Sequence, residues 1–235
     1  MTDYYAAAAL KKAPTVRAMF DGVAEKYDLF NAVLSLGLDS LWRRCALRAL
    51  FADLPEGRVL DLGCGSGDLA GALSGRREVL GLDFSGAMLR RARAKFPAPS
   101  WAQADALRLP LRAGALAGAM TAFMVRNLAD VPLCFREVFR ALRPGGRFVI
   151  LEFSLPRGWL MRRLFLAYLH TAFPLACLLL RGDPGAYESL RKSIRSFAAT
   201  VDLVRLLQEA GFIAVHARPL LGGGVVLYEA VKPGA

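Results

Sequence analysis

The chain has 235 residues, 55% of them hydrophobic, which suits one α/β domain with a proper core. Its four cysteines form no C-x-x-C pair, so the sequence predicts neither a metal site nor a disulfide framework, and a reducing cytoplasm is the expected compartment. It lacks an uncharged apolar run of about 18 residues, and its start lacks the basic and apolar regions of a secretory signal, so no membrane span or export is predicted.

The formal net charge of +11 predicts an electropositive surface. Nucleic acid, an anionic membrane or the anionic parts of small ligands would each suit such a surface. An arginine-rich composition on a solvated surface explains the charge equally well. The charge alone therefore leaves the partner open.

The first 50 residues are predicted to form a tail and a helical cap in front of a domain over 51–235. Residues 1–14 read as a tail, and residues 15 to about 50 carry apolar side chains at helical spacing. Trp42, Cys45, Ala46 and Ala49 show this spacing.

From residue 58 onward, predicted strands and helices alternate, which indicates a parallel sheet covered on both faces. The predicted strands are 58–62, 78–83, 101–103, 116–123 and 147–153. The predicted helices are 68–74, 86–96 and 131–142. Ser85 is the expected N-cap of the second helix, and the turn at 143–146 is expected to end the third.

After residue 153 the alternation stops. Residues 155–199 are predicted to be a helical lid, inserted before a last unit made of a helix over 201–210 and strands over 212–218 and 225–231. Gly211 is the expected cap of that last helix. A lid in this place is suited to covering a substrate.

The glycines at 63, 65 and 67 follow a predicted buried strand and open a helix, a context that favours ligand binding. Asp61 precedes the turn and suits a cationic group of a ligand. Asp83 ends the second strand, where a carboxylate can accept from ribose hydroxyls, and Asp105 follows the third, where it can accept from an adenine amino group. The alternatives are a glycine turn with carboxylates that cap helices, and a nicotinamide site.

This region resembles the class I S-adenosylmethionine-dependent methyltransferases. The resemblance implies a Rossmann-like fold with a seven-stranded, mainly parallel sheet, helices on both faces and an antiparallel final strand pair. It implies S-adenosylmethionine as the cofactor, bound by Asp61, Gly63, Gly65, Ser66, Gly67, Asp83, Phe84, Met88, Asp105, Ala106 and Ala122. Ser66 stands where a threonine is usual, and Ala122 where a serine is common.

Four further stretches resemble the C-methyltransferases of menaquinone and ubiquinone biosynthesis. They are FDGVAEKYD at 20–28, FMVRN at 123–127, LRPGGR at 142–147 and YESL at 187–190. The resemblance implies methylation of a ring carbon of a polyprenyl quinol, with demethylmenaquinol as the expected acceptor. A benzoquinol or another small lipophilic molecule is the alternative acceptor. The C-terminal end lacks the family's terminal His-x-Gly.

The acceptor side of the site is expected after the fourth strand, where parallel α/β sheets bind ligands. Arg126 and Asn127 are predicted to hold the quinol oxygens, either directly or through a water, and so to favour the oxyanion. The alternative is that Arg126 pairs with an acid and Asn127 caps the following helix. Tyr27 is the third candidate for catalysis, with a role as a core aromatic equally open. Asn31, Phe123 and Tyr187 complete the predicted acceptor site with Tyr27 and Arg126.

Residues 164–180 are almost entirely apolar and are flanked by Arg162, Arg163 and Arg181. The segment is too interrupted to span a bilayer, and it is expected either to touch an anionic membrane peripherally or to line the lid. A lipophilic quinol is therefore the expected small-molecule partner. Nucleic acid is not expected, because the arginines are scattered and no stacking-aromatic motif is present. The sequence leaves open whether the protein forms a homodimer.

Overall fold

We describe a computed structural model of the chain in which residues 32, 35, 37–179 and 184–234 are described. Its centre is a seven-stranded sheet in the order β3-β2-β1-β4-β5-β7-β6. The strands are β1 (Val59–Leu62), β2 (Val79–Asp83), β3 (Ser100–Gln103), β4 (Leu116–Ala122), β5 (Leu142–Phe153), β6 (Ile213–Leu220) and β7 (Val225–Val231). The first five are parallel, and β7 runs antiparallel to both β5 and β6. The predicted sheet with its antiparallel final pair is confirmed.

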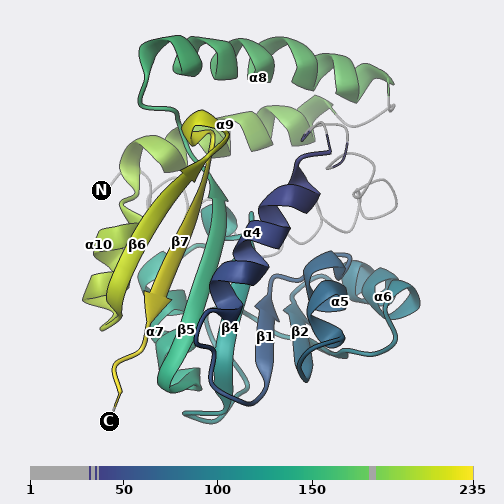
Figure 1. Cartoon of the computed structure of the whole chain (residues 1–235). Helices are drawn as coiled ribbons and strands as arrows, with labels where there is room; N and C mark the ends of the chain where they lie inside the picture. The colour runs from purple at the N-terminus through teal and green to yellow at the C-terminus, as the bar shows by residue number, and fades with distance from the viewer. Residues whose placement is uncertain (1–31, 33–34, 36, 180–183, 235) are drawn as a thin grey trace.

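Helices cover both faces of this sheet (Figure 1). They are α4 (Asp39–Phe51), α5 (Asp68–Ser74), α6 (Gly86–Lys95), α7 (Val131–Ala141), α8 (Trp159–Leu179), α9 (Pro184–Thr200) and α10 (Leu203–Glu209), with 3₁₀ turns η2 (Val125–Asn127) and η3 (Leu221–Gly223). Ser85 caps α6, since its Oγ accepts from Met88 N at 3.1 Å. Gly211 follows α10 with φ +100°, as the cap prediction requires.

The strand β1 shows why the central strands read as unbroken apolar runs. Leu60 and Leu62 join the core beneath α7 and α10, whereas Val59 faces the other core, which holds Trp42 and Leu50 of α4. Successive side chains of a strand point to opposite faces, so a strand covered on both sides needs apolar residues throughout. Burying each leucine stabilises the fold by about 1.5–3 kcal/mol.

The start of β5 differs from the prediction. The turn expected at 143–146 is instead a bulge inside the strand, which already begins at Leu142. Leu142 pairs with Leu116 of β4, and the next pair is Arg147 with Gly118, so the register shifts between the two pairs. Gly145 adopts φ +74°. The bulge is held from the far end of the chain, because Lys232 N donates to Gly146 O at 2.8 Å and Gly145 N to Lys232 O at 3.0 Å.

The two helices after β5 occupy the segment predicted as a lid, and α9 ends one residue beyond it, at Thr200. The helix α8 packs against α9, and Figure 1 shows α8 as the outermost element, on the far side of α9 from the sheet. Phe165 and Leu169 of α8 meet Ile194 of α9 in a small core of their own. Within the described residues, no helix is both long enough and apolar enough to cross a bilayer.

The predicted boundary between residues 50 and 51 falls inside α4. Trp42 and Leu50 of this helix are buried against the sheet, so α4 belongs to the layer that covers it. Residues 1–31 lie outside the described part, and the division into cap and domain stays a prediction.

Candidate active site

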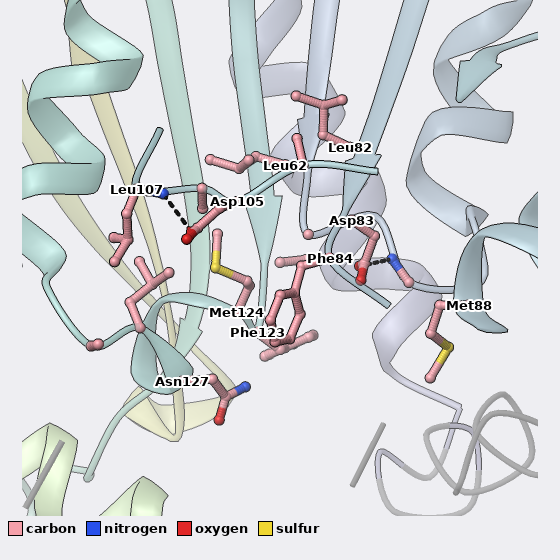
Figure 2. Close-up of a pocket in the computed structure, with 17 residues that line it drawn as sticks. Leu62, Leu82, Asp83, Phe84, Met88, Asp105, Leu107, Phe123, Met124 and Asn127 are labelled. Carbon is pink, nitrogen blue, oxygen red and sulfur yellow. Dashed lines mark hydrogen bonds between the residues drawn. The ribbon is translucent and has the colours of Figure 1, made fainter. Parts of the chain in front are cut away.

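A cavity opens at the carboxyl ends of β1, β2 and β4 (Figure 2). Its volume is roughly 890 Å³, including the mouth that is open to solvent. The lining residues are Leu62, Gly63, Gly65, Leu82, Asp83, Phe84, Met88, Ala104, Asp105, Ala106, Leu107, Ala122, Phe123, Met124, Asn127, Leu128 and Ala129.

The glycine turn between β1 and α5 forms one wall of this cavity. Gly63, Gly65 and Gly67 all have positive φ, at +69°, +53° and +88°. A side chain would also lack room, since a Cβ on Gly63 would lie 2.4 Å from Met124 Cγ and one on Gly67 2.6 Å from the Trp101 ring. Glycine is therefore required by both backbone conformation and close packing.

Asp83 is fixed at the end of β2 by the backbone around it. Its Oδ2 accepts from Gly65 N and its Oδ1 from Ser85 N, both at 2.8 Å. Each carboxylate oxygen can accept more than one hydrogen bond, so a carboxylate in this place suits the hydroxyl donors of a ligand in the cavity. The position fits the predicted ribose contact.

Asp105 stands on the opposite side of the cavity, just after β3 (Figure 2). Its Oδ1 accepts from Leu107 N at 2.9 Å, which fixes the turn that follows. The exposed carboxylate can accept from an amino group, while Phe84 and Met88 supply apolar surface across the cavity. This combination suits an aromatic base with an amino substituent.

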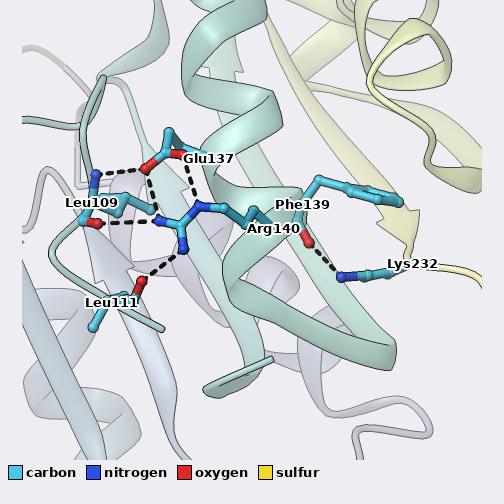
Figure 3. Close-up of polar contacts among 6 residues, drawn as sticks. All are labelled: Leu109, Leu111, Glu137, Phe139, Arg140 and Lys232. Carbon is cyan, nitrogen blue, oxygen red and sulfur yellow. Dashed lines mark hydrogen bonds and ion pairs between the residues drawn. The ribbon is translucent and has the colours of Figure 1, made fainter. Parts of the chain in front are cut away.

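An ion pair on α7 holds the chain that continues from Asp105 (Figure 3). Arg140 donates to Leu111 O at 2.7 Å and to Leu109 O at 3.2 Å, while Glu137 Oε2 accepts from Leu109 N at 2.9 Å. Glu137 and Arg140 also bond to each other at 2.9 Å, which lowers the pKa of the glutamate and raises that of the arginine. We call these two residues the α7 clamp.

Asp61 lies outside the cavity lining and is only 1% exposed. Its Oδ2 accepts from Ala70 N at 2.9 Å, at the start of α5. The pKa of Asp61 is raised to about 7, chiefly by burial and also by the nearby charges of Asp83 and Asp68, while Arg43 and the Ala70 N–H oppose the rise. Its predicted role toward a ligand cation stays a prediction.

Phe123 and Asn127 form the wall of the cavity beyond β4. Phe123 adopts φ +59°, a strained conformation for an aromatic residue, and donates its N–H to Leu151 O at 2.7 Å. Its ring packs against Phe153, with centroids 4.6 Å apart, and against Trp42 at 6.2 Å. These contacts hold the turn that presents Asn127 to the cavity (Figure 2).

Asn127 does not cap the next helix. Asp130 is the N-cap of α7, with its Oδ1 accepting from Leu133 N at 2.8 Å. The alternative interpretation of Asn127 is therefore wrong. Its amide, which carries both donors and an acceptor, is positioned to meet a ligand.

Arg126 is buried behind this turn and is absent from the cavity lining. Its Nη1 donates to Glu152 Oε1 at 2.8 Å and also to Phe123 O, and its backbone N–H donates to Glu152 Oε2 at 3.2 Å. Glu152, 1% exposed, also accepts from Phe153 N at 2.8 Å. This is the predicted alternative in which Arg126 pairs with an acid, and a direct contact with the acceptor stays a prediction.

Comparison with known proteins decides the family. The sequence matches the ubiE/COQ5 methyltransferase family over residues 8–232. The chain belongs to this family. It is 39% identical over 218 residues to the demethylmenaquinone methyltransferase of Beutenbergia cavernae, covering 92% of this chain and 90% of the relative. It is 38% identical over 223 residues to the ubiquinone/menaquinone biosynthesis C-methyltransferase UbiE of Syntrophotalea carbinolica, covering 92% and 93%.

Solved structures agree on the fold of this methyltransferase. An S-adenosylmethionine-dependent methyltransferase from Mesorhizobium loti is similar with a TM-score of 0.58 and 25% identity, over 83% of this chain and all of that one. A SAM-dependent methyltransferase from Thermotoga maritima is similar with a TM-score of 0.64 and 20% identity, over 92% and 98%. The predicted Rossmann-like methyltransferase fold and the resemblance in the sequence are confirmed.

The predicted site residues of this family member fall into three groups. Those that line the cavity are Gly63, Gly65, Asp83, Phe84, Met88, Asp105, Ala106, Ala122, Phe123 and Asn127. Those described but absent from its lining are Asp61, Ser66, Gly67 and Arg126. Tyr27 and Asn31 lie outside the described residues, and Tyr187 belongs to α9 but its side chain is not described.

Sequence reasoning missed seven apolar residues of the lining. These residues are Leu62, Leu82, Ala104, Leu107, Met124, Leu128 and Ala129. Leu62 and Leu82 stand at or beside the ends of buried strands, which is the signal that could have found them. Met124 carries no such signal, because its position depends on the close approach to Gly63.

Proposed function

We propose that this methyltransferase transfers a methyl group from S-adenosylmethionine to a ring carbon of a polyprenyl quinol, with demethylmenaquinol as the acceptor and menaquinol as the product. The observation that carries the choice of acceptor is the similarity, along nine-tenths of both chains, to a protein named demethylmenaquinone methyltransferase. The cavity at the strand ends supports the choice of cofactor.

The residues of the cavity fit S-adenosylmethionine by their hydrogen-bonding chemistry. The cofactor carries ribose hydroxyls and an adenine amino group, all of which are donors, and Asp83 and Asp105 are acceptors on opposite sides of the cavity. Asp61, Ser66 and Gly67 would support the turn beside the amino acid portion. When bound, the cofactor supplies a sulfonium methyl group that is already a strong electrophile.

The chain must then position the acceptor and raise its nucleophilicity. A quinol ring carbon gains electron density when a neighbouring hydroxyl is deprotonated, so a donor near that oxygen favours the reaction. Asn127 is the cavity residue suited to this role, and Arg126 with Glu152 holds its turn in place. Phe123 and Met124 exclude water and provide an apolar contact for the ring. Tyr27, Asn31 and Tyr187 complete the proposed acceptor site.

A methyl-transfer assay tests the proposal. Labelled S-adenosylmethionine is supplied with short-chain demethylated naphthoquinol, and separately with a short-chain benzoquinol, each kept reduced. We expect label in the naphthoquinol, and the oxidised quinone should accept none because its ring carbon is a poor nucleophile. Label in the benzoquinol alone would assign the alternative acceptor, and label in neither would refute quinol methylation.

We also propose that the enzyme works in the cytoplasm in peripheral contact with an anionic membrane. A polyprenyl tail keeps its quinol in lipid, so an enzyme that methylates it reaches its acceptor at the bilayer surface. The described residues include no helix that could cross a bilayer. Nucleic acid is not a proposed partner. If RNA were bound through the charge of +11, the affinity would fall steeply with salt, which a filter-binding titration measures.

A further inference from the structure

We propose that the outward face of α8 and the adjoining turn η3 form the surface by which this protein docks on an anionic bilayer. The role of this docking in delivering a polyprenyl quinol rests on the proposed function. The docking itself rests on the exposed side chains and charges of these two elements.

Much of the exposed surface of α8 is apolar, where a surface helix is ordinarily polar, although Arg163, His170 and Thr171 are exposed on it as well. Phe165 and Leu169 point inward, toward Ile194 of α9. Elsewhere on the helix, Trp159 is 71% exposed, and Leu164 and Leu175 are both 56% exposed. Further exposed residues along this helix are Leu160, Ala167 and Pro174. Such a face lacks a partner within the described residues and suits an apolar environment.

The tip of the last strand pair extends this surface. Leu221 of η3 is 48% exposed, and Gly222 next to it lies against Met161 of α8, where an added Cβ would come within 2.8 Å of Met161 Cγ. Gly224 likewise lies against the Phe165 ring, where an added Cβ would come within 2.9 Å of the ring. Two segments about sixty residues apart in the sequence thus form one apolar surface.

The charges around this surface favour a lipid occupant. Arg157, Arg162 and Arg163 are exposed at the start of α8, and the sequence holds no acidic residue between Glu152 and Asp183. Arginines beside an apolar helix face contact anionic head groups, and a tryptophan such as Trp159 suits the head-group level. A second copy of the chain would bring the same arginines face to face in a two-fold interface, which like charges disfavour.

The orientation of α8 and its neighbours fits docking in the plane of the membrane. The 21-residue helix contains Pro174 and does not qualify as a membrane span. Its inward face packs on α9, and α9 in turn contacts η2, the turn that carries Asn127 at the cavity. The docked layer and the acceptor side of the cavity are therefore connected through one helix.

Vesicle sedimentation tests the surface directly. The full chain is mixed with vesicles of phosphatidylcholine containing phosphatidylglycerol, or with phosphatidylcholine alone. We expect the wild type to sediment with the anionic vesicles and the Trp159→Glu/Leu164→Glu variant to lose at least tenfold in bound fraction. Ile213→Glu is the control, because Ile213 lies on edge strand β6 and, at 51%, is about as exposed as Leu164 at 56%. This variant should bind as the wild type does.

A second variant tests the docking surface in case the first variant misfolds. Arg162→Gln/Arg163→Gln leaves the apolar face intact and should weaken binding to anionic vesicles several-fold, with a smaller effect at high salt. Binding by either docking variant equal to that of the wild type would overturn the proposal, as would a wild type that ignores anionic vesicles. A dimer in solution that the Trp159→Glu/Leu164→Glu change dissociates would instead assign the face to a second copy.

Activity measurements separate docking from the proposed function. The Trp159→Glu/Leu164→Glu variant should methylate a soluble short-chain quinol at the wild-type rate and lose at least tenfold with a long-chain quinol embedded in vesicles. Equal losses on both acceptors would contradict a docking role. A wild type that binds vesicles but methylates no quinol would refute the proposed function and leave the docking surface standing.

Discussion

Asp61 is held where ionisation is unfavourable. Its folded pKa of about 7 is raised chiefly by burial and further by Asp83 and Asp68, with Arg43 acting against the rise. An aspartate in an unfolded chain has a pKa of about 3.9. Between these two values the folded state keeps a proton that the unfolded state has lost, so the free energy of unfolding must fall as pH rises through this window.

We therefore predict that the cofactor-free protein loses stability between pH 5 and about pH 7 and that Asp61→Asn flattens this slope. Urea unfolding at a series of pH values measures it. Asp105→Asn is the control, since Asp105 is exposed and should leave the slope unchanged. A slope in Asp61→Asn as steep as in the wild type would show that Asp61 is not its source.

The pair of Arg126 and Glu152 leads to a second prediction. Because both side chains are buried and bonded to the turn that carries Asn127, Arg126→Ala should lower kcat by at least tenfold. Cofactor affinity should change little, since neither residue lines the cavity. Loss of one partner leaves a buried charge, which costs about 3–5 kcal/mol of stability. Steady-state kinetics and cofactor titration measure the two effects.

Glu152→Gln separates positioning from direct contact with the acceptor. If Arg126 acts by holding the turn, removing the carboxylate charge should lower kcat about as much as Arg126→Ala does. The kcat values are compared only if the two variants unfold at similar temperatures, so that a difference in stability does not explain a difference in kcat. Full turnover in Glu152→Gln beside an inactive Arg126→Ala would assign Arg126 a direct role instead.

At the level of elements, the sequence predicted what depends on short-range patterns. The carboxylates Asp83 and Asp105 stand at predicted strand ends, and parallel strands bring their ends to one edge. The Arg126–Glu152 pair depends on the register of β4 with β5, in which Ala122 faces Leu151, and single-sequence patterns do not specify register between strands. The bulge in β5 likewise depends on Lys232, which is remote in the sequence.

The α7 clamp gives the prediction at this scale. Arg140→Ala removes the donors to Leu109 O and Leu111 O, which should loosen the chain that continues from Asp105. Hydrogen bonds to charged groups contribute about 1.5–3 kcal/mol, and exposure of the Arg140 side chain reduces this. We expect cofactor Kd to rise about three- to tenfold, equivalent to roughly 1 kcal/mol, with kcat at saturation unchanged.

Arg205→Ala is the matched control for the clamp. Arg205 also pairs with a glutamate of its own helix, Glu209 at 2.7 Å, but both side chains are exposed and the pair holds no loop. Exposed pairs of this kind contribute little, so cofactor Kd should stay at the wild-type value. Isothermal titration measures both variants, and equal affinities for Arg140→Ala and the wild type would contradict the clamp.

Across the whole molecule, the central strands are far more deeply buried than the outermost helix. The strands β1, β4 and β5 lie between two covered faces, with residues such as Leu60 and Val149 fully buried. The helix α8 is anchored mainly through Phe165 and Leu169 and exposes its other face. Elements with few buried apolar contacts open locally at lower free energy than the core does. The cofactor cavity thus sits on the stable part, and the proposed docking surface on the outermost part.

Amide hydrogen exchange tests this division. Peptides of α8 should exchange through local opening, faster than those of β4 and β5, whose exchange requires global unfolding. S-adenosylmethionine should slow exchange in the glycine turn around Gly63 and Gly65, whereas anionic vesicles should slow it in α8 and η3. Because the two ligands act on separate regions, each protection should persist without the other. Equal exchange in α8 and β4, or vesicle protection confined to β6, would contradict this division of the molecule.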